Sequence, residues 1–257
     1  LNASAGTRLS FAADAALVVN GPVNFTGTAE APVELRAATA AGWPGMAVME
    51  ADAGSELTHV TVRNTTSVVL DQWVLTGGVN FYASNVLINN CRFFDSRGED
   101  ALNIIQSEFE IYNSDIRGTA SDAFDADFSK GVILNCNFIN CGNDGVDISG
   151  GNLNVTECGF FSIKDKAVSA GEKSKLSLTN SVIKNSSMGI ISKDLSELKS
   201  LNNTIINCEI AYCAFQKKGE FGPGKIFSEH DSISNCNKEN LIEYNSSLTI
   251  NGAKTED

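Results

Sequence analysis

The chain has 257 residues, of which 19 are basic and 31 acidic, and its formal net charge is −12. This acidic balance argues against nucleic acid as a partner, because such binding depends on Lys and Arg neutralising phosphates. It argues equally against an anionic membrane surface. No run of about 18 apolar residues is present, so the sequence predicts no membrane span.

The first third of the chain contains short β-type runs at uneven spacing. Gly- and Pro-containing segments at 27–32 and 42–45 are typical of turns. Between and around them, strands are expected at 16–19, 33–35, 46–49, 57–62 and 79–81. We interpret residues 1–83 as irregular N-terminal coils of the repeat that follows.

From Asp100 onward, residue types recur every 22 positions. Three columns in phase show this: Asp100, Asp122 and Asp144 are acidic, Ala101, Ala123 and Gly145 are small, and Leu102, Phe124 and Val146 are apolar. A fixed period in the twenties is typical of a solenoid, in which each repeat packs only on its neighbours.

Each repeat contains three short β-type runs separated by polar corners, for example 132–134, 138–139 and 145–149. The Leu spacing and helical half of a leucine-rich repeat are not visible. We therefore predict an all-β fold, a right-handed parallel β-helix with coils of about 22 residues. It would form a single domain over 1–257, with regular coils at 84–222 and C-terminal coils at 223–257.

The seven cysteines are an odd number, and no pair has the CxxC spacing of a zinc site. Cys136 and Cys158 are 22 residues apart and should stack on adjacent coils. Buried thiols that pack as small hydrophobic groups are favoured here over a disulfide.

Alternation along a strand separates inward from outward positions. If Leu102, Phe124 and Val146 face the core, the residues that follow them should face solvent. The outward positions are Asp125, Asp147 and Ser169 in one column, and Asp127, Ser149, Gly171 and Lys193 in the next. Adjacent coils lie about 4.8 Å apart, so these acids should be close neighbours and should repel. A bound cation, a shared proton, or Lys166 and Lys193 could offset that repulsion.

This face is the candidate site. Its predicted metal ligands are Asp125, Asp127 and Asp147, and Ca²⁺, which prefers oxygen ligands, is the one cofactor that the pattern predicts. The predicted catalytic residues are Asp144, Lys166, Glu172, Lys193 and Asp194. The predicted substrate-binding residues are Asp122, Ser169, Gln216 and Lys217. Either lysine could act as a base, and Glu172 could act as an acid. The column Asp100, Asp122 and Asp144 also fits a structural role at a corner, where Asp commonly bonds the backbone.

The segment Asn143-Asp144-Gly145-Val146-Asp147 is similar to the Asn-Thr-Asp-Gly-Ile-Asp stretch of polygalacturonases, which are pectin-cleaving β-helix glycosidases of the pectin-lyase-like group. The resemblance implies a right-handed β-helix with a sugar-binding groove along one sheet. Asp144 matches the first family Asp, and Asp165 matches one member of the following pair. Lys166 replaces the second acid of that pair, and Met188-Gly189-Ile190 replaces the family's Gly-His-Gly.

The segments 121–129, 165–174 and 192–196 also resemble β-helix modules of secreted bacterial multidomain proteins, some of which carry CotH-like kinase domains. This resemblance implies an extracellular or cell-surface location. It also implies that the chain can be a module of a larger protein.

Three functional hypotheses remain open from the sequence. The first is a polysaccharide-directed enzyme, a lyase, epimerase or glycosidase acting on acidic glycans. The second is a non-catalytic glycan-binding or adhesion module, for which Phe128, Tyr212 and Phe215 are candidate stacking platforms. The third is a structural spacer of a larger secreted protein. The expected partner is a polysaccharide, and we expect the chain to be a monomer.

Overall fold

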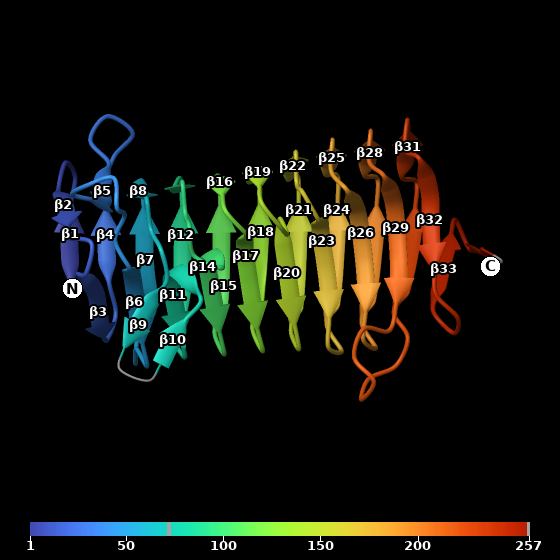
Figure 1. Ribbon diagram of the computed structural model, residues 1–257, viewed down its shortest axis with the longest axis horizontal. Coiled ribbons are helices and arrows are strands. Elements are labelled where there is room, and N and C mark those ends of the chain that lie inside the picture. The colour runs from blue at the N-terminus through green and yellow to red at the C-terminus, as the bar shows by residue number, and fades with distance from the viewer. Residues whose placement is uncertain (71–72, 256–257) are drawn as a thin grey trace.

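The computed structural model describes residues 1–70 and 73–255, whose strands coil into an elongated parallel β-solenoid (Figure 1). Three long sheets, named A, B and C, run along the solenoid, and each complete coil contributes one strand to each sheet. The first and last strands of the described chain lie toward opposite ends of the long axis (Figure 1). Within the described residues, no helix has the length and apolar character needed to cross a membrane.

The strands of the described chain are as follows. Sheet A consists of β1 (Asn2–Ser4), β4 (Asn24–Thr26), β7 (Ser55–Thr58), β12 (Val86–Asn89), β15 (Glu108–Tyr112), β18 (Lys130–Leu134), β21 (Asn152–Thr156), β24 (Lys175–Thr179), β27 (Glu197–Leu201), β30 (Lys225–Glu229), β33 (Ser247–Ile250) and β34 (Ala253–Lys254). Sheet B consists of β2 (Arg8–Phe11), β5 (Val33–Ala37), β8 (Val60–Arg63), β13 (Arg92–Phe94), β16 (Asp115–Thr119), β19 (Asn137–Cys141), β22 (Gly159–Phe161), β25 (Val182–Lys184), β28 (Thr204–Ile206) and β31 (Ser232–Ser234). Sheet C consists of β3 (Ala16–Asn20), β6 (Gly45–Met49), β11 (Gly77–Tyr82), β14 (Asp100–Ile105), β17 (Asp122–Asp127), β20 (Val146–Ser149), β23 (Lys166–Gly171), β26 (Met188–Lys193), β29 (Ile210–Phe215) and β32 (Lys238–Ile242). A separate antiparallel hairpin joins β9 (Val68–Leu70) and β10 (Trp73–Leu75).

The register of sheet C confirms the predicted inward column. Leu102 pairs with Phe124, which pairs with Val146, and all three side chains are fully buried. The steps between equivalent residues are 22 or 23 residues in the middle of the chain, but 33 residues between Ala51 and Ser84 and 28 residues between Asn203 and Asp231. The longer steps accommodate the β9–β10 hairpin and a loop at 216–224.

One predicted strand is wrong in its boundaries. The run 57–62 is not one strand, because His59 has a φ of 50° and turns the chain between β7 and β8. Left-handed backbone recurs at the same corner in later coils, at Asn90, Asn113 and Asn135. Asn tolerates this conformation better than most side chains, which explains why Asn is frequent in the repeat.

Small polar side chains at the corners connect successive coils. At the corner between sheets C and A, the Ser84 backbone N–H donates to Ser107 Oγ at 2.8 Å, and the Ser107 N–H donates to Ser129 Oγ at 3.1 Å. At the corner between sheets A and B, the Ser114 N–H donates to Cys136 Sγ at 3.4 Å. Cys136 and Cys158 are buried free thiols, as predicted.

Candidate functional site

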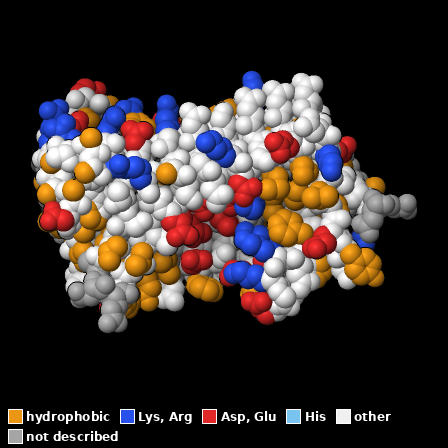
Figure 2. Space-filling model, viewed as in Figure 1, with side chains coloured by type: hydrophobic (Ala, Val, Ile, Leu, Met, Phe, Trp, Pro, Cys, Tyr) orange, Lys and Arg blue, Asp and Glu red, His pale blue; other side chains and the backbone are white. Residues whose placement is uncertain are grey.

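Six aspartates lie on or next to β14, β17 and β20 in sheet C, three of them on the outward side (Asp125, Asp127 and Asp147) and three at or just before the starts of the strands (Asp100, Asp122 and Asp144). We name this group the acidic face: Asp100, Asp122, Asp125, Asp127, Asp144 and Asp147. Acidic side chains gather in the middle of the visible surface, with Lys and Arg on the side toward the C-terminal end (Figure 2). The predicted alignment of Asp125 with Asp147 is confirmed, because these residues are directly paired on β17 and β20.

Asp125 is the most perturbed carboxyl group of the face. Burial, together with the charges of Asp100, Asp127 and Asp147, raises its pKa from 3.8 to about 9. Asp125 therefore carries a proton at neutral pH. Its side chain still remains partly accessible to solvent, so a bound molecule can reach it.

Asn103 is the register partner of Asp125 on β14, and it is 2% exposed. Its Nδ2 donates to Thr76 Oγ1 at 2.7 Å and to Asp100 Oδ2 at 2.9 Å. Its Oδ1 accepts no hydrogen bond from the described residues. Most buried acceptors of this kind have a donor partner, so Asn103 Oδ1 is one of a few exceptions among the described residues.

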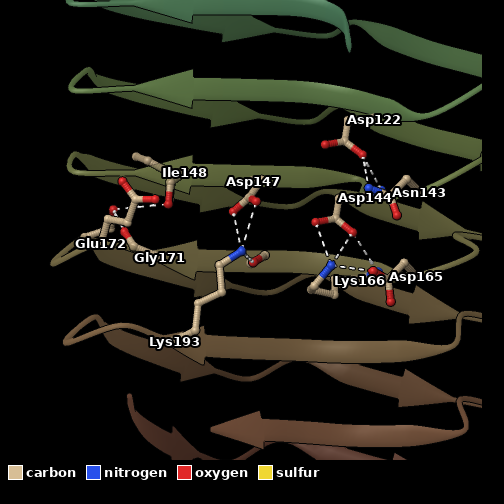
Figure 3. Close-up of polar contacts among 12 residues, drawn as sticks. Asp122, Asn143, Asp144, Asp147, Ile148, Asp165, Lys166, Gly171, Glu172 and Lys193 are labelled. Carbon is tan, nitrogen blue, oxygen red and sulfur yellow. Dashed lines mark hydrogen bonds and ion pairs between the residues drawn. The ribbon is translucent and has the colours of Figure 1, made fainter. Parts of the chain in front are cut away.

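Asp147 is in a different environment from Asp125, because a lysine reaches it from two strands away. Lys193 Nζ lies 3.1 Å from Asp147 Oδ2 and donates to Ser169 Oγ at 3.0 Å (Figure 3). The stem of Lys193 passes over Gly171, where a Cβ atom would lie 2.7 Å from Lys193 Cε. Ser169 is fully buried and Lys193 is 5% exposed, so the prediction that both face solvent is wrong. They point outward from the sheet, but this crossing covers them.

A second ion pair lies at the start of the same strands. Lys166 Nζ lies 3.0 Å from Asp144 Oδ1 and also pairs with Asp165 (Figure 3). Burial alone would lower the pKa of Lys166, but the two carboxylates outweigh it and raise the pKa. Burial likewise raises the pKa of Asp144 to about 6. Asp122 Oδ1 accepts hydrogen bonds from Asn143 Nδ2 and from the Asp144 N–H, so it bonds the backbone at this corner.

The remaining predicted site residues organise the loop at 216–224. Asp194 is fully buried, and its Oδ1 accepts the N–H groups of Lys217 and Lys218 at 2.7 and 2.8 Å. Gln216 is exposed, and its Nε2 donates to the Phe221 carbonyl at 2.7 Å. Glu172 pairs with Lys218 at the end of β23. Asp194 and Gln216 thus hold the loop, while the side chain of Lys217 is exposed.

Among residues 1–70 and 73–255, no group of three or more His, Cys, Asp or Glu side chains is arranged to hold a metal ion. Lys193 Nζ lies 3.1 Å from Asp147 Oδ2, so this carboxylate already has a cationic partner. The assignment of Asp125, Asp127 and Asp147 as Ca²⁺ ligands stays a prediction, as do the catalytic and substrate-binding roles assigned from the sequence.

Sequence reasoning missed two participants in the site, Asn103 and Lys218. Asn103 occupies the same column as Asp125 and Asp147, so the 22-residue step could have identified it. Lys218 lies in an insertion between β29 and β30 that breaks the period. Its pairing with Glu172 therefore left no trace in the repeat.

The family model for the right handed β-helix region matches residues 50–203 and 100–255. The chain belongs to the right-handed β-helix family. The predicted fold class and the pectin-lyase-like resemblance are thereby confirmed. No curated protein gives a significant sequence match.

Solved structures share the fold at low sequence identity. An alginate lyase from Paenibacillus sp. has a TM-score of 0.58 at 10% identity, over 98% of this chain and 90% of that chain. Tailspike protein 2 of an Escherichia coli O157:H7 bacteriophage has a TM-score of 0.61 at 12% identity, over 96% and 39%. The catalytic domain of a GH87 α-1,3-glucanase has a TM-score of 0.52 at 11% identity, over 97% of this chain. This chain spans 63% of that domain.

Proposed function

We propose that this protein binds a polysaccharide along sheet C and hydrolyses its glycosidic bonds at Asp125 and Asp147. The observation that carries the proposal is the pairing of two adjacent carboxyl groups in different environments. Burial raises the pKa of Asp125 to about 9, whereas Asp147 forms an ion pair with Lys193. Two carboxyl groups whose environments separate their protonation states are the usual acid and base of glycoside hydrolysis.

The spacing of the pair suggests the stereochemical course. Direct strand neighbours are about 4.8 Å apart, close to the carboxyl separation of about 5–5.5 Å in retaining glycosidases. Asp125 would protonate the leaving glycosidic oxygen while Asp147 attacks the anomeric carbon. Water would then displace Asp147 from that carbon, and the Asp125 carboxylate would accept the proton of the water. Both side chains remain partly accessible, as this mechanism requires.

The same geometry favours hydrolysis over elimination with a lysine as the base. A lysine acts as a base only when it is neutral. Two carboxylates raise the pKa of Lys166, and Lys193 Nζ contacts Asp147 Oδ2 and Ser169 Oγ. Both predicted bases are therefore engaged in ion pairs.

The likeness of the fold to a glucanase, an alginate lyase and a tailspike supports polysaccharide as the substrate class. An extracellular or cell-surface location, implied by the resemblance to secreted modules, is part of the same proposal. Calcium is a second candidate participant, which would bring an acidic glycan to the carboxylates.

The test is incubation of the protein with α-1,3-glucan, alginate and polygalacturonate, each with Ca²⁺ and with chelator. Hydrolysis releases reducing ends without the ultraviolet absorbance of unsaturated uronates. We expect Asp125→Asn and Asp147→Asn each to lower the rate by about 100-fold or more. Asp14→Asn, at an exposed turn before β3, is the matched control and should have no effect.

Each other outcome has a definite meaning. Unsaturated products would show that the reaction is elimination rather than hydrolysis. Full activity of Asp125→Asn would remove Asp125 from the mechanism. Tight binding without turnover of any of the three polysaccharides would support the glycan-binding alternative.

A further inference from the structure

The β9–β10 hairpin carries an exposed tryptophan next to sheet C. Trp73 is 54% exposed, and its ring meets the ring of Tyr82 edge to face, with centroids 6.1 Å apart. The chain's second tryptophan, Trp43, is fully buried and stacks on Phe11. Trp73 is therefore the one tryptophan that solvent and ligands can reach.

Tyr82 places this aromatic pair on the same face as the acidic residues. It pairs with Ile105 on β14, and Ile105 pairs with Asp127 on β17. Two strand spacings, roughly 10 Å, therefore separate the Tyr82 position from Asp127. A short oligosaccharide lying along the solenoid axis can bridge that distance.

The hairpin is anchored to the sheet by a small apolar cluster. Val68 and Leu75 are buried against Ala47, and Met49 packs against the same group. Ala47 precedes Asn80 in the column that continues to Asn103 and Asp125. The hairpin therefore lies on the outward side of sheet C and flanks the acidic face toward the N-terminal end (Figure 1).

The exposed Trp73 indole, which meets the Tyr82 ring edge to face, suits the face of a sugar ring. Trp and Tyr present a broad apolar ring together with a polar N–H or O–H group. The face of a sugar ring is apolar where its C–H bonds point outward, and its rim carries hydroxyl groups. Such a ring can cover the indole and exclude water from it, while its hydroxyls bond the polar groups nearby.

We propose that Trp73 and Tyr82 form a stacking subsite for one sugar ring of the polysaccharide whose scissile bond reaches Asp125 and Asp147. This subsite rests on the proposed function, because the same chain of sugars must extend along sheet C. It adds a binding residue on an insertion that lies outside the repeat. It also assigns the N-terminal side of the acidic face to substrate binding.

The test uses tetrasaccharides of α-1,3-linked glucose, of alginate and of polygalacturonate as probes. Tryptophan emission of the intact protein is recorded during titration, and the dissociation constant is measured independently by calorimetry. We expect at least one probe to shift the emission of Trp73. We expect Trp73→Ala to weaken binding of that probe by about tenfold or more, with a smaller loss for Trp73→Phe.

Val74→Ala is the matched control, because Val74 is adjacent on β10 and 64% exposed but carries no ring. It should leave binding unchanged. Equal affinity of the protein and Trp73→Ala for a bound probe overturns the subsite, as does failure of all three probes to change the emission at millimolar concentration. Weaker binding by Trp73→Ala in a protein without hydrolytic activity would keep the subsite and overturn the catalytic proposal. If neither hydrolysis nor probe binding changes in Trp73→Ala, the subsite is overturned and the catalytic proposal is kept.

Discussion

At the scale of single residues, Asp125 and Asp147 show how one repeated position acquires two different environments. Both occupy the same column of sheet C on adjacent strands. Lys193 reaches Asp147 but not Asp125, which instead has Asn103 and further acids around it. The difference arises from the reach of one side chain across two strands, because the local sequence around the two aspartates is similar.

The raised pKa of Asp125 makes stability depend on pH. Between the ordinary value of 3.8 and the folded value of about 9, the folded protein binds one more proton at this site than the unfolded chain. Stability therefore falls as pH rises through this window. We expect Asp125→Asn to increase the free energy of unfolding by about 1–3 kcal/mol near pH 8 and to have little effect near pH 4. Urea unfolding at both pH values measures this.

Asp147→Asn is the control for this prediction and should have the opposite sign near pH 8. It leaves the buried ammonium group of Lys193 without its carboxylate partner, which is destabilising. A stabilisation by Asp125→Asn that is the same at both pH values would show that burial does not hold its proton.

At the scale of elements, corner side chains determine how one coil is attached to the next. Ser107 accepts the N–H of Ser84 and donates to the carbonyl of Ile105, so it closes the corner between β14 and β15. Cysteines do the same at another corner, where Cys91 Sγ accepts the Val60 N–H at 3.4 Å. Such positions accept a small residue with a polar atom, which explains why Cys91, Ser114 and Cys136 can share the column at the corner between sheets A and B.

Ser107→Ala tests this role. It leaves the buried Ser84 N–H without an acceptor, and we expect a loss of about 1–3 kcal/mol in the free energy of unfolding. Ser107→Cys should lose less, because a thiol accepts the equivalent bond in the Cys91 corner. Ser177→Ala, on the outward side of β24, should change stability by less than about 0.5 kcal/mol. Equal losses for Ser107→Ala and Ser177→Ala would contradict this account.

At the scale of the whole molecule, the chain is a solenoid whose regular coils carry longer insertions at several corners. The β9–β10 hairpin and the 216–224 loop both flank the acidic face along the axis. Each coil otherwise packs only on its two neighbours, so the architecture should tolerate removal of a coil in register.

Deletion of residues 138–159, one 22-residue coil, tests this modularity. Phe138 pairs with Phe160, so the deletion joins Asn137 to Phe160 in register. We expect a folded protein with a single urea transition and an m-value lower by about a tenth, because less surface is exposed on unfolding. The deletion removes Asp144 and Asp147, so activity should be lost. Deletion of 138–148, which shifts the register, should prevent folding, and a similar stability for both deletions would count against the solenoid model.

Much of this protein could be predicted from the sequence because the 22-residue period acts locally and repeatedly. Leu102, Phe124 and Val146 occupy the same position of successive coils and pair across neighbouring strands, so their side chains all enter the core. The same alternation placed Asp125 and Asp147 side by side on the outward side. Periodicity of this kind survives in the sequence because each coil must match the coil before it.

The tertiary structure alone decided how the outward residues are partnered. Lys193 folds back to Asp147, Lys218 closes on Glu172, and Trp73 comes to Tyr82 from an inserted hairpin. These contacts depend on side-chain reach and on insertions that have no counterpart in neighbouring coils. A repeat therefore specifies the backbone and the core, whereas the chemistry of its surface depends on the path of individual side chains in space.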